Sequence, residues 1–425
     1  MEFLFLAFVC LFPFPLINLC LGQATTTSTA NGATYTNPIL NAMGADPWVI
    51  RYEDYYYMTY TTNDNITILR SSVLTDWNNA DVKLAFSPPA NTSYSKDLWA
   101  PELHFLDGLW YIIFTADVDA DTPSPEQDMY CDFSCPAVNH RMFVLESSGA
   151  DPWGSSYSFK AELDTYGQFA IDGTYFAHAS GLYHVYSCWE GAYVSWPSML
   201  CITRLANPWT VSSSSPLSAR VVISRPDQPW EKTPYNRTVN VRLSSNEGPE
   251  QLTNPATGQQ FIIYSAARSD NRNYCLGQLA LAGGDDADPM DPGAWTKRTA
   301  GCVFYENPDE QVYGVGHASF TTSPDGAEHW IVYHGMQNYL EGWTARTIRA
   351  QKFTFSHVDG APVFPRPGMG PYAVPAGAGA VWGSEINNAT RGSGSGSSSS
   401  AGSGMSGTSA SSVTAYPASS SWVFA

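Results

Sequence analysis

Short runs of aromatic and β-branched residues, each opened by a polar turn, recur along the middle of this chain. Five windows share the pattern: residues 46–60, 101–116, 172–189, 247–267 and 316–335. In each window a Gly- or Asp-containing turn separates two such runs, which predicts a β-hairpin. None of the windows shows the 3.6-residue periodicity of an amphipathic helix. The pattern therefore predicts an all-β chain.

A polar residue able to take part in chemistry stands at or near the start of every window. These anchors are Asp46, Glu102, Asp172, Glu247 and His317, separated by 56 to 75 residues. Such a period leaves room for a four-stranded blade with its loops, and five blades arranged radially form a β-propeller. A β-sandwich is the alternative, but it does not explain the repeated anchor. In a five-bladed β-propeller the innermost strands surround one axis, so the anchors are expected to meet at one mouth of the central channel.

Three of the anchors, Asp46, Asp172 and Glu247, are carboxylic acids. Hydrolysis of a glycosidic bond needs one acid to protonate the leaving oxygen and one carboxylate to activate water or attack carbon. A third acid nearby raises the pKa of the proton donor, because like charges resist joint ionisation. Each residue taken alone is also an ordinary turn former, since Asp-Pro and Asp-Gly are common turn dipeptides. Their shared place at the starts of hairpins favours a catalytic cluster.

Several segments together resemble glycoside hydrolase family 43. They are ADPWVIRYEDYYYMTY, LWAPELHFLDGLWYIIFTA, IDGTYF, NEGPE and GVGHASF, and the resemblance spans roughly residues 36–370. It implies a five-bladed propeller that acts on arabinans, arabinoxylans or xylo-oligosaccharides with inversion of configuration. It also implies that Asp46 is the general base, that Glu247 is the general acid, and that Asp172 tunes the pKa of Glu247 and orients it.

The resemblance extends to residues around the carboxylates. Trp99 is expected to stack on the sugar and Glu102 to accept hydrogen bonds from its hydroxyls, with core packing between blades as the alternative for Trp99. Trp48 is expected to wall the pocket, because strand alternation points it the same way as the general base. Arg346 matches an arginine that reaches a sugar hydroxyl or a catalytic acid, whereas a surface salt bridge fits Arg349 equally well.

His317 matches the axial histidine of the family, which binds a hydrated cation or a water network in the channel. A neutral, hydrogen-bonded core histidine is the alternative. No cofactor is expected to be required. A Ca²⁺ or Na⁺ ion in the channel, held through water, is the expected metal, because hard cations keep their waters. Such an ion would support the site without acting as a Lewis acid.

Charge narrows the range of partners. The formal net charge of the 425-residue chain is −18. An acidic chain without a basic patch is a poor binder of nucleic acid and of anionic membranes, whereas a neutral polysaccharide is not repelled. With the resemblance, the expected partners are plant cell-wall polysaccharides (arabinan or arabinoxylan) or oligosaccharides derived from them. We expect a monomer that binds neither nucleic acid nor membrane.

The ends of the chain indicate an exported protein. Residues 1–22 form an apolar run typical of a secretory signal peptide, with an uncleaved membrane anchor as the alternative. Residues 23–35 form a short N-terminal segment, and residues 36–385 are predicted to form the catalytic propeller. Residues 386–425 form a Gly/Ser-rich tail that is predicted to be disordered. The expected location is extracellular.

Cysteines and glycosylation motifs agree with export. Six cysteines remain once the predicted signal peptide is removed, and an even number in an exported protein indicates disulfides. Neighbours in sequence would pair as Cys131–Cys135, Cys188–Cys201 and Cys275–Cys302. A zinc site is the alternative, but the sequence has no CxxC pair. Asn-x-Ser/Thr motifs stand at Asn65, Asn91, Asn236 and Asn388.

The sequences of three segments indicate which activity within the family to expect. NEGPE, GVGHAS and RTIRAQ look most like members that remove terminal L-arabinofuranose, especially from α-1,5-arabinan, so the expected activity is that of an exo-α-L-arabinofuranosidase. A β-xylosidase and an endo-α-1,5-arabinanase are alternatives in the same family. A carbohydrate-binding propeller without turnover and a protein-interaction propeller are alternatives of other classes. The three intact carboxylates argue against both of these.

Overall fold

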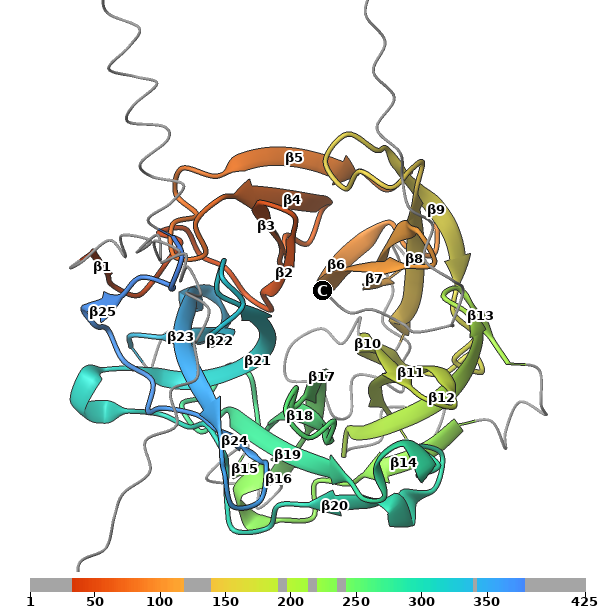
Figure 1. Cartoon of the computed structure of the whole chain (residues 1–425). Coiled ribbons are helices and arrows are strands. Elements are labelled where there is room, and N and C mark those ends of the chain that lie inside the picture. Colours follow the sequence, from red (N-terminus) through yellow and green to blue (C-terminus); the bar gives the residue numbers. More distant parts are fainter. Residues whose placement is uncertain are drawn as a thin grey trace, which may run out of the picture.

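Five antiparallel sheets surround a central axis in the computed structural model (Figure 1). It describes residues 33–117, 139–189, 197–212, 220–234, 242–338 and 342–378. Each sheet is built from consecutive strands, and its first strand lies nearest the axis. The predicted five-bladed β-propeller is confirmed.

The strands of the blades follow the order of the chain. The first two blades contain β2 (Trp48–Tyr52), β3 (Tyr55–Thr59), β4 (Ile66–Ser71) and β5 (Asp81–Phe86), then β6 (Lys96–Leu106), β7 (Leu109–Asp117), β8 (Arg141–Ser147) and β9 (Tyr157–Glu162). The third contains β10 (Ala170–His178), β11 (Gly181–Cys188), β12 (Met199–Asn207) and β13 (Thr210–Val211), and β14 (Arg220–Ser224) also pairs with β12. The last two contain β17 (Asn246–Thr253), β18 (Gln260–Ala266), β19 (Cys275–Leu281) and β20 (Trp295–Lys297), then β21 (Tyr313–Thr322), β22 (His329–Met336), β23 (Thr347–Phe355) and β24 (Pro362–Val363).

Four further strands and five single-turn 3-10 helices complete the described elements. The strands are β1 (Thr34–Tyr35), β15 (Lys232–Pro234), β16 (Arg242–Ser244) and β25 (Tyr372–Ala373). The helices are η3 (Pro229–Glu231), η4 (Gly284–Asp286), η5 (Pro292–Ala294), η6 (Pro308–Glu310) and η7 (Gly342–Ala345). Within the described residues, no helix has the length and apolar character needed to span a membrane.

Local sequence explains the hairpins. Leu106 pairs directly with Leu109, so the turn between β6 and β7 has only two residues, Asp107 and Gly108. Their φ angles are 52° and 84°. A two-residue hairpin turn with positive φ at both positions matches the twist of the strands, and Asp-Gly is among the residue pairs that best tolerate it.

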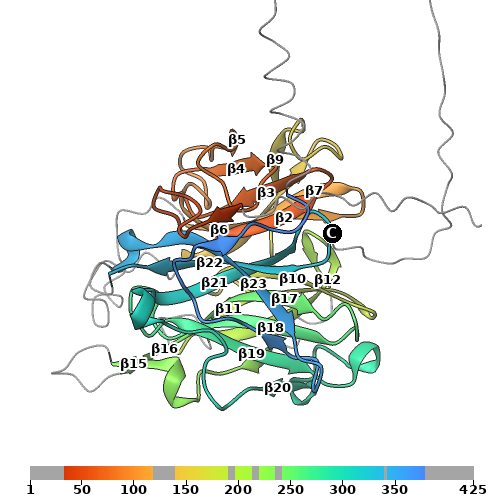
Figure 2. The ribbon, with the colours of Figure 1, turned by 60° about the vertical axis from the view of Figure 1, so that its left-hand side comes forward.

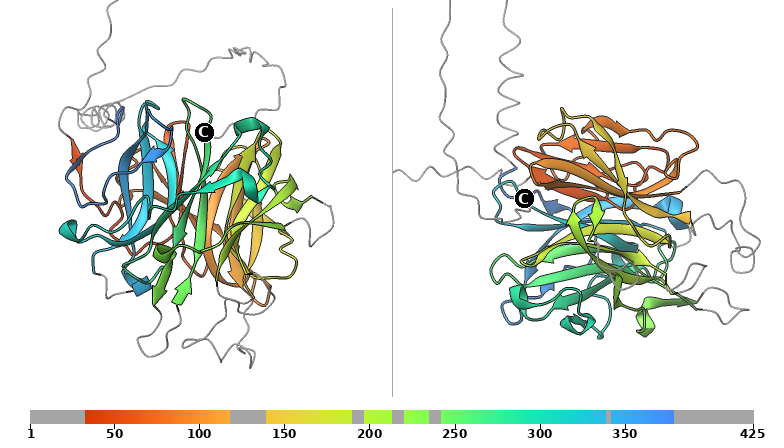
Figure 3. Two further views of the ribbon diagram at one scale, coloured as in Figure 1. Left: turned by 90° about the horizontal axis from the view of Figure 1, so that it is seen from below. Right: turned by 90° about the vertical axis from the view of Figure 1, so that its right-hand side faces the viewer.

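The cores lie between blades. Five clusters of buried hydrophobic side chains each combine residues of two neighbouring blades, and the set includes the interface between the first and fifth blades. Figure 2 shows the blades packed face against face, and the left view of Figure 3 shows strands running along the axis. Because both faces of each sheet are covered, the middle strands are continuously apolar, as in LWYIIFTA of β7.

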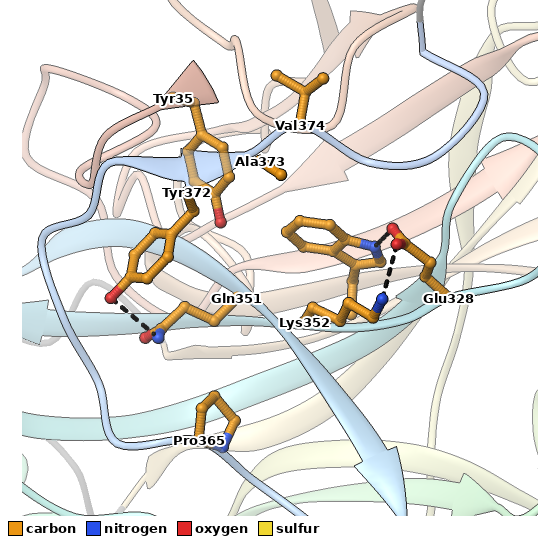
Figure 4. Close-up of a pocket in the computed structure, with 9 residues that line it drawn as sticks. Tyr35, Glu328, Gln351, Lys352, Pro365, Tyr372, Ala373 and Val374 are labelled. Carbon is orange, nitrogen blue, oxygen red and sulfur yellow. Dashed lines mark hydrogen bonds and ion pairs between the residues drawn. The ribbon is translucent and has the colours of Figure 1, made fainter. Parts of the chain in front are cut away.

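A short clasp joins the ends of the propeller. Strand β1 pairs with β25, and the side-chain amide nitrogen of Asn37 donates to the carbonyl oxygen of Ala350 (3.1 Å) in β23. Under the clasp lies a cavity of about 280 Å³ (Figure 4), lined by Tyr35, Glu328, Trp330, Gln351, Lys352, Pro365, Tyr372, Ala373 and Val374. It contains none of the predicted site residues.

Two of the three predicted disulfides are confirmed, Cys188–Cys201 and Cys275–Cys302. Other predictions lie outside the described residues: the signal peptide, Cys131–Cys135, the motifs at Asn236 and Asn388, and the Gly/Ser-rich tail.

Candidate active site

β-bulges near the start of four innermost strands build the mouth of the channel. The inner strand gains one residue over its partner strand at a single bulge in β10 and β17, and at each of two successive bulges in β6 and β21. The bulge that these four strands share contains a residue with positive φ: Ala100, Asp172, Gly248 and His317. Asp46 has the matching conformation just before β2, which has no bulge. An inserted residue bends the strand and re-aims side chains. The bulges thereby bring Asp46, Asp172 and His317 to equivalent places, and Glu247 to the place one residue earlier.

Hydrogen bonds between blades form a ring that holds these bulges. The second strand of one blade, or for Thr61 the segment just after it, supplies an acceptor for a backbone N–H in the next blade. These bonds run from Ala100 N to Thr61 Oγ1 (2.8 Å), Asp172 N to Thr115 Oγ1 (3.0 Å), His317 N to Ser265 Oγ (2.7 Å) and Asp46 N to His334 Nδ1 (3.1 Å). Between the third and fourth blades, Ser187 Oγ instead donates to the carbonyl oxygen of Asn246 (3.1 Å). The ring includes a bond from the first blade back to the fifth.

Asp46 is a buried carboxylate surrounded by donors. Thr61 Oγ1 donates to its Oδ2 (2.6 Å), and His317 Nδ1 and Arg346 Nη1 lie 3.2 Å and 3.3 Å from its Oδ1. Burial alone would raise the pKa of Asp46, but the charges of His317 and Arg346 and the hydrogen bond from His317 hold it well below its ordinary value. Asp46 is therefore ionised, as a general base must be.

Asp172 and Glu247 show the opposite shift. Burial raises the pKa of Asp172 to about 7, and the charges of Glu247 and Asp46 add to the rise. Burial also raises the pKa of Glu247, although hydrogen bonds from Ser245 and Tyr274 oppose it. The backbone N–H of Gly248, next to Glu247, donates to Asp172 Oδ2 (3.3 Å). Asp172 thus holds the backbone beside Glu247, while the two carboxyl groups resist joint ionisation.

His317 links the two aspartates as a cation. Its Nδ1 lies 3.2 Å from Asp46 and 3.9 Å from Asp172. Burial alone would lower its pKa, but the two carboxylates raise it to about 9. A protonated imidazole cannot ligate a metal, and Nδ1 already faces Asp46, so the residues present do not fit a direct metal ligand. The channel Ca²⁺ or Na⁺ held through water stays a prediction.

Glu102 and Trp48 lie one layer deeper than predicted. The register places Glu102, Glu250, Thr174 and Ser319 two residues after the positive-φ residue of each bulge. Trp48 likewise follows Asp46 by two residues. The expectation that Glu102 is equivalent to the other anchors is wrong, because the bulge inserts one residue before it. Glu102 is buried, and His104 Nε2 lies 2.8 Å from its Oε2. Trp48 is also buried, with its ring 4.4 Å from that of His104. Neither placement supports a direct contact with substrate.

The deeper carboxyl groups are neutral over most of the pH range. Burial raises the pKa of Glu102 to about 8 and lowers that of His104 to about 3, so their contact is a hydrogen bond between neutral groups and not an ion pair. Burial and the neighbouring Glu102 raise the pKa of Glu250 well above its ordinary value. This layer forms a neutral floor below the charged mouth.

The remaining predicted residues differ in their placement. Trp99 is half-buried and occupies the position in β6 that corresponds to Glu247 in β17. Its indole N–H donates to Asn63 Oδ1 (3.0 Å). Its ring stacks on that of His140, with the ring centroids 4.1 Å apart. Arg346 Nη1 lies 3.3 Å from Oδ1 of Asp46, the residue predicted to be the general base. Arg349 is fully buried, so the surface salt bridge is wrong. Its side chain points to the opposite side of β23, where Nη1 lies 3.2 Å from Met369 Sδ.

Family membership follows from the sequence comparison. A sequence model described as glycosyl hydrolases family 43 matches residues 35–362. The chain belongs to glycoside hydrolase family 43.

Relatives in the family carry related names. An extracellular exo-α-(1→5)-L-arabinofuranosidase of Streptomyces avermitilis is 32% identical over 349 residues, which cover 80% of this chain and 65% of the relative. A protein of the same name from Streptomyces chartreusis is 31% identical over 313 residues, covering 72% and 83%. The crystal structure of an α-L-arabinofuranosidase from Lactobacillus brevis is 30% identical, with a TM-score of 0.66, and covers 80% of this chain and 98% of that one. The chain thus spans less than two thirds of the length of the S. avermitilis relative.

Sequence reasoning missed the residues that support the family 43 carboxylates. The residues that supply the ring's side chains each follow an aromatic residue, in the second strand of a blade or just after it: Tyr60-Thr61, Phe114-Thr115, Tyr186-Ser187, Tyr264-Ser265 and Tyr333-His334. This repeat was a usable signal. The contact of Tyr274 with Glu247 had no such signal, because Tyr274 precedes a third strand.

An exposed tryptophan next to Arg346 was also missed. Trp343, in η7, is 54% exposed. Its indole N–H donates to Ser269 Oγ (3.0 Å), and its carbonyl accepts from Arg346 Nε (3.1 Å). An indole held at this place offers a flat apolar face next to the arginine that contacts Asp46.

One group among the described residues has the makeup of a metal site. Ligand atoms of Asp97, Asp117 and His140 all lie within 4.8 Å of one another. Within this group His140 Nδ1 lies 3.5 Å from Asp117 Oδ2, and both side chains are buried.

Proposed function

We propose that this family 43 protein releases terminal L-arabinofuranose from α-1,5-linked arabinan by an inverting reaction. The observation that carries the proposal is the division among three carboxyl groups at one mouth: Asp46 is held ionised, whereas burial raises the pKa of Glu247 and Asp172. One base and one acid with pKa values pushed apart is the requirement for glycoside hydrolysis. The names of the two Streptomyces relatives support arabinofuranose as the sugar.

The carboxyl groups divide the reaction between them. Glu247 donates its proton to the leaving glycosidic oxygen, which takes the electron pair of the breaking C–O bond. Asp46 accepts a proton from a water molecule, whose oxygen attacks the anomeric carbon from the opposite face. Asp172 keeps Glu247 protonated and holds the backbone at Gly248. His317 and Arg346 keep Asp46 ionised before the attack.

Residues at the rim are proposed to bind the sugar. Trp343 and Trp99 each present an anchored indole, and aromatic rings stack on the apolar faces of sugars. Arg346 bridges Trp343 and the base, so a sugar on Trp343 would lie next to the attacking water. We also propose that the protein acts outside the cell as a monomer on plant cell-wall arabinan, arabinoxylan or oligosaccharides derived from them. The two disulfides support export.

The test is product analysis with the purified full chain on linear 1,5-α-arabinan, arabinoxylan and xylo-oligosaccharides. Arabinose as the only early product from linear arabinan, released as the β-anomer when followed by NMR, is the expected result. Early oligosaccharides would indicate an endo-arabinanase instead, and xylose from xylo-oligosaccharides a β-xylosidase. Sugar binding without any product would leave a carbohydrate-binding propeller.

A further inference from the structure

The carboxyl group of Glu247 is held on both oxygens. Tyr274 Oη donates to its Oε1 (2.8 Å), and Ser245 Oγ donates to its Oε2 (2.7 Å). We propose that Tyr274 is a positioning residue that holds Glu247 for proton transfer to the leaving oxygen. The inference rests on the proposed function, because it assumes that Glu247 is the general acid.

The fold builds a dedicated place for the Tyr274 ring. Tyr274 is 1% exposed, although it lies in the connection before β19. A Cβ on Gly316 would lie 2.3 Å from Tyr274 Cε1, so any larger residue there would displace the ring. Gly316 belongs to the bulge of the fifth blade, next to His317. The strand that supplies His317 thus also leaves room for the tyrosine.

The Tyr274 ring also lies against the histidine that holds the base. It is parallel to the His334 ring, with centroids 5.6 Å apart and planes inclined by 2°. His334 Nδ1 accepts the backbone N–H of Asp46 (3.1 Å), and burial lowers the pKa of His334 to about 4, so the ring is neutral. One packed pair of rings therefore connects the side chain of the acid with the backbone of the base, across the fourth, fifth and first blades.

The hydrogen bond to Glu247 strengthens during the reaction. In the resting enzyme Tyr274 donates to a neutral carboxyl group. As Glu247 gives up its proton, the same bond becomes charge-assisted, and such bonds are shorter and stronger. A donor already aimed at the developing charge stabilises the transition state without reorganisation. The bond also favours the ionised form, so it opposes the rise that burial gives to the pKa of Glu247.

Other charged groups face Glu247 and must be kept constant in a test. They are Asp46 before β2, Asp172 in β10 and His317 in β21; Arg346 before β23 contacts Asp46. Tyr274→Phe changes none of them and keeps the aromatic ring against His334. A matched control exists in the same blade: Tyr264 donates to the buried carboxylate of Glu231 (2.8 Å), which is not one of the three site carboxylates.

The experiment compares pH profiles of kcat/KM for the wild type, Tyr274→Phe and Tyr264→Phe on arabino-oligosaccharides and on 4-nitrophenyl α-L-arabinofuranoside. For Tyr274→Phe we expect kcat on oligosaccharides to fall about 10-fold, part of the full contribution of a general acid, with KM nearly unchanged. The loss should be smaller on the nitrophenyl substrate, whose leaving group needs less protonation. The basic limb should move to higher pH, since Glu247 loses a bond that favours its ionised form. Tyr264→Phe should keep the wild-type profile.

A wild-type profile in Tyr274→Phe, or a change in KM alone, would overturn the inference while leaving the proposed function intact. If Tyr274→Phe does not fold, Ser245→Ala is the alternative variant, because it removes the other hydrogen bond to Glu247. A basic limb of its pH profile that does not move would count against the inference that donors to Glu247 position it and favour its ionised form. Absence of product from the wild type would overturn the proposed function and the inference together.

Discussion

The mouth of the channel and the floor directly below it are built from the same bulges but have opposite electrostatics. At the mouth, Asp46 carries a negative charge that His317 and Arg346 balance. On the floor, Glu102 and Glu250 have raised pKa values, and the adjacent His104 is neutral. Burial acts in the same direction on the carboxyl groups of both layers. The difference shows that nearby cations, and not burial, decide which carboxylate can act as a base.

The comparison also separates two uses of a buried acid. Glu247 and Glu102 both have raised pKa values, but Tyr274 and Ser245 donate to Glu247, whereas a neutral histidine contacts Glu102. Donors stabilise the ionised form that Glu247 must reach in each cycle of the proposed reaction. Glu102 has no corresponding step in the proposed reaction, and its layer is expected to contribute to stability.

The largest loss of activity is expected when Asp46, the proposed base, is replaced. Asp46→Asn removes the ionised group that activates water, so kcat/KM should fall by about 10²–10⁴-fold on arabinan and on 4-nitrophenyl arabinofuranoside alike. Asp107→Asn is the control: Asp107 has nearly the same φ (52° against 56°) in an exposed turn at the other end of a blade. Comparable activity of Asp46→Asn and Asp107→Asn would remove Asp46 from the mechanism.

The loss of activity on replacing the proposed acid, Glu247, should depend on the leaving group of the substrate. Glu247→Gln should lose about 10²-fold or more on arabinan, the range of general acid catalysis. It should lose much less on 4-nitrophenyl arabinofuranoside, which leaves without protonation. Steady-state rates on both substrates make the test, and equal losses would contradict the assignment of Glu247 as the proton donor.

A smaller effect is expected at the rim above the mouth. Trp343→Ala should raise KM for arabino-oligosaccharides about 5-fold, the scale of a single aromatic contact, while kcat changes little. Tyr55→Ala, an exposed aromatic residue in the β2–β3 hairpin at the opposite end of the blade, is the control. A fall in kcat with unchanged KM would show that Trp343 acts on the base through Arg346 instead.

The smallest effect on activity is expected on the floor. Because Glu102 is protonated below pH 8, Glu102→Gln should retain most of the activity at the pH optimum. Its folded pKa of about 8 lies above the ordinary value of 4.5, so the wild type loses stability as the pH rises from about 4.5 to 8. The glutamine variant does not have this loss. Its Tm relative to the wild type should therefore rise by about 2 °C or more between pH 5 and pH 8, as measured by thermal denaturation. A constant difference in Tm would contradict the neutral state of Glu102.

The sequence alone predicted the hairpins, the five blades and the shared place of three carboxyl groups at the starts of hairpins. These features depend on alternation, turn dipeptides and repetition, which are local properties of the chain. The sequence suggested two disulfides that the structure then confirmed, because their cysteines are neighbours along the chain. Only the tertiary structure decided the layer of each anchor, because a bulge of one residue moved Glu102 down and re-aimed Asp172 and His317. It alone also decided the charge states, since Arg346 lies 300 residues from Asp46 in the chain and 3.3 Å from it in space. Electrostatic interactions depend on distance in space, and the spacing of residues along a chain does not contain that distance.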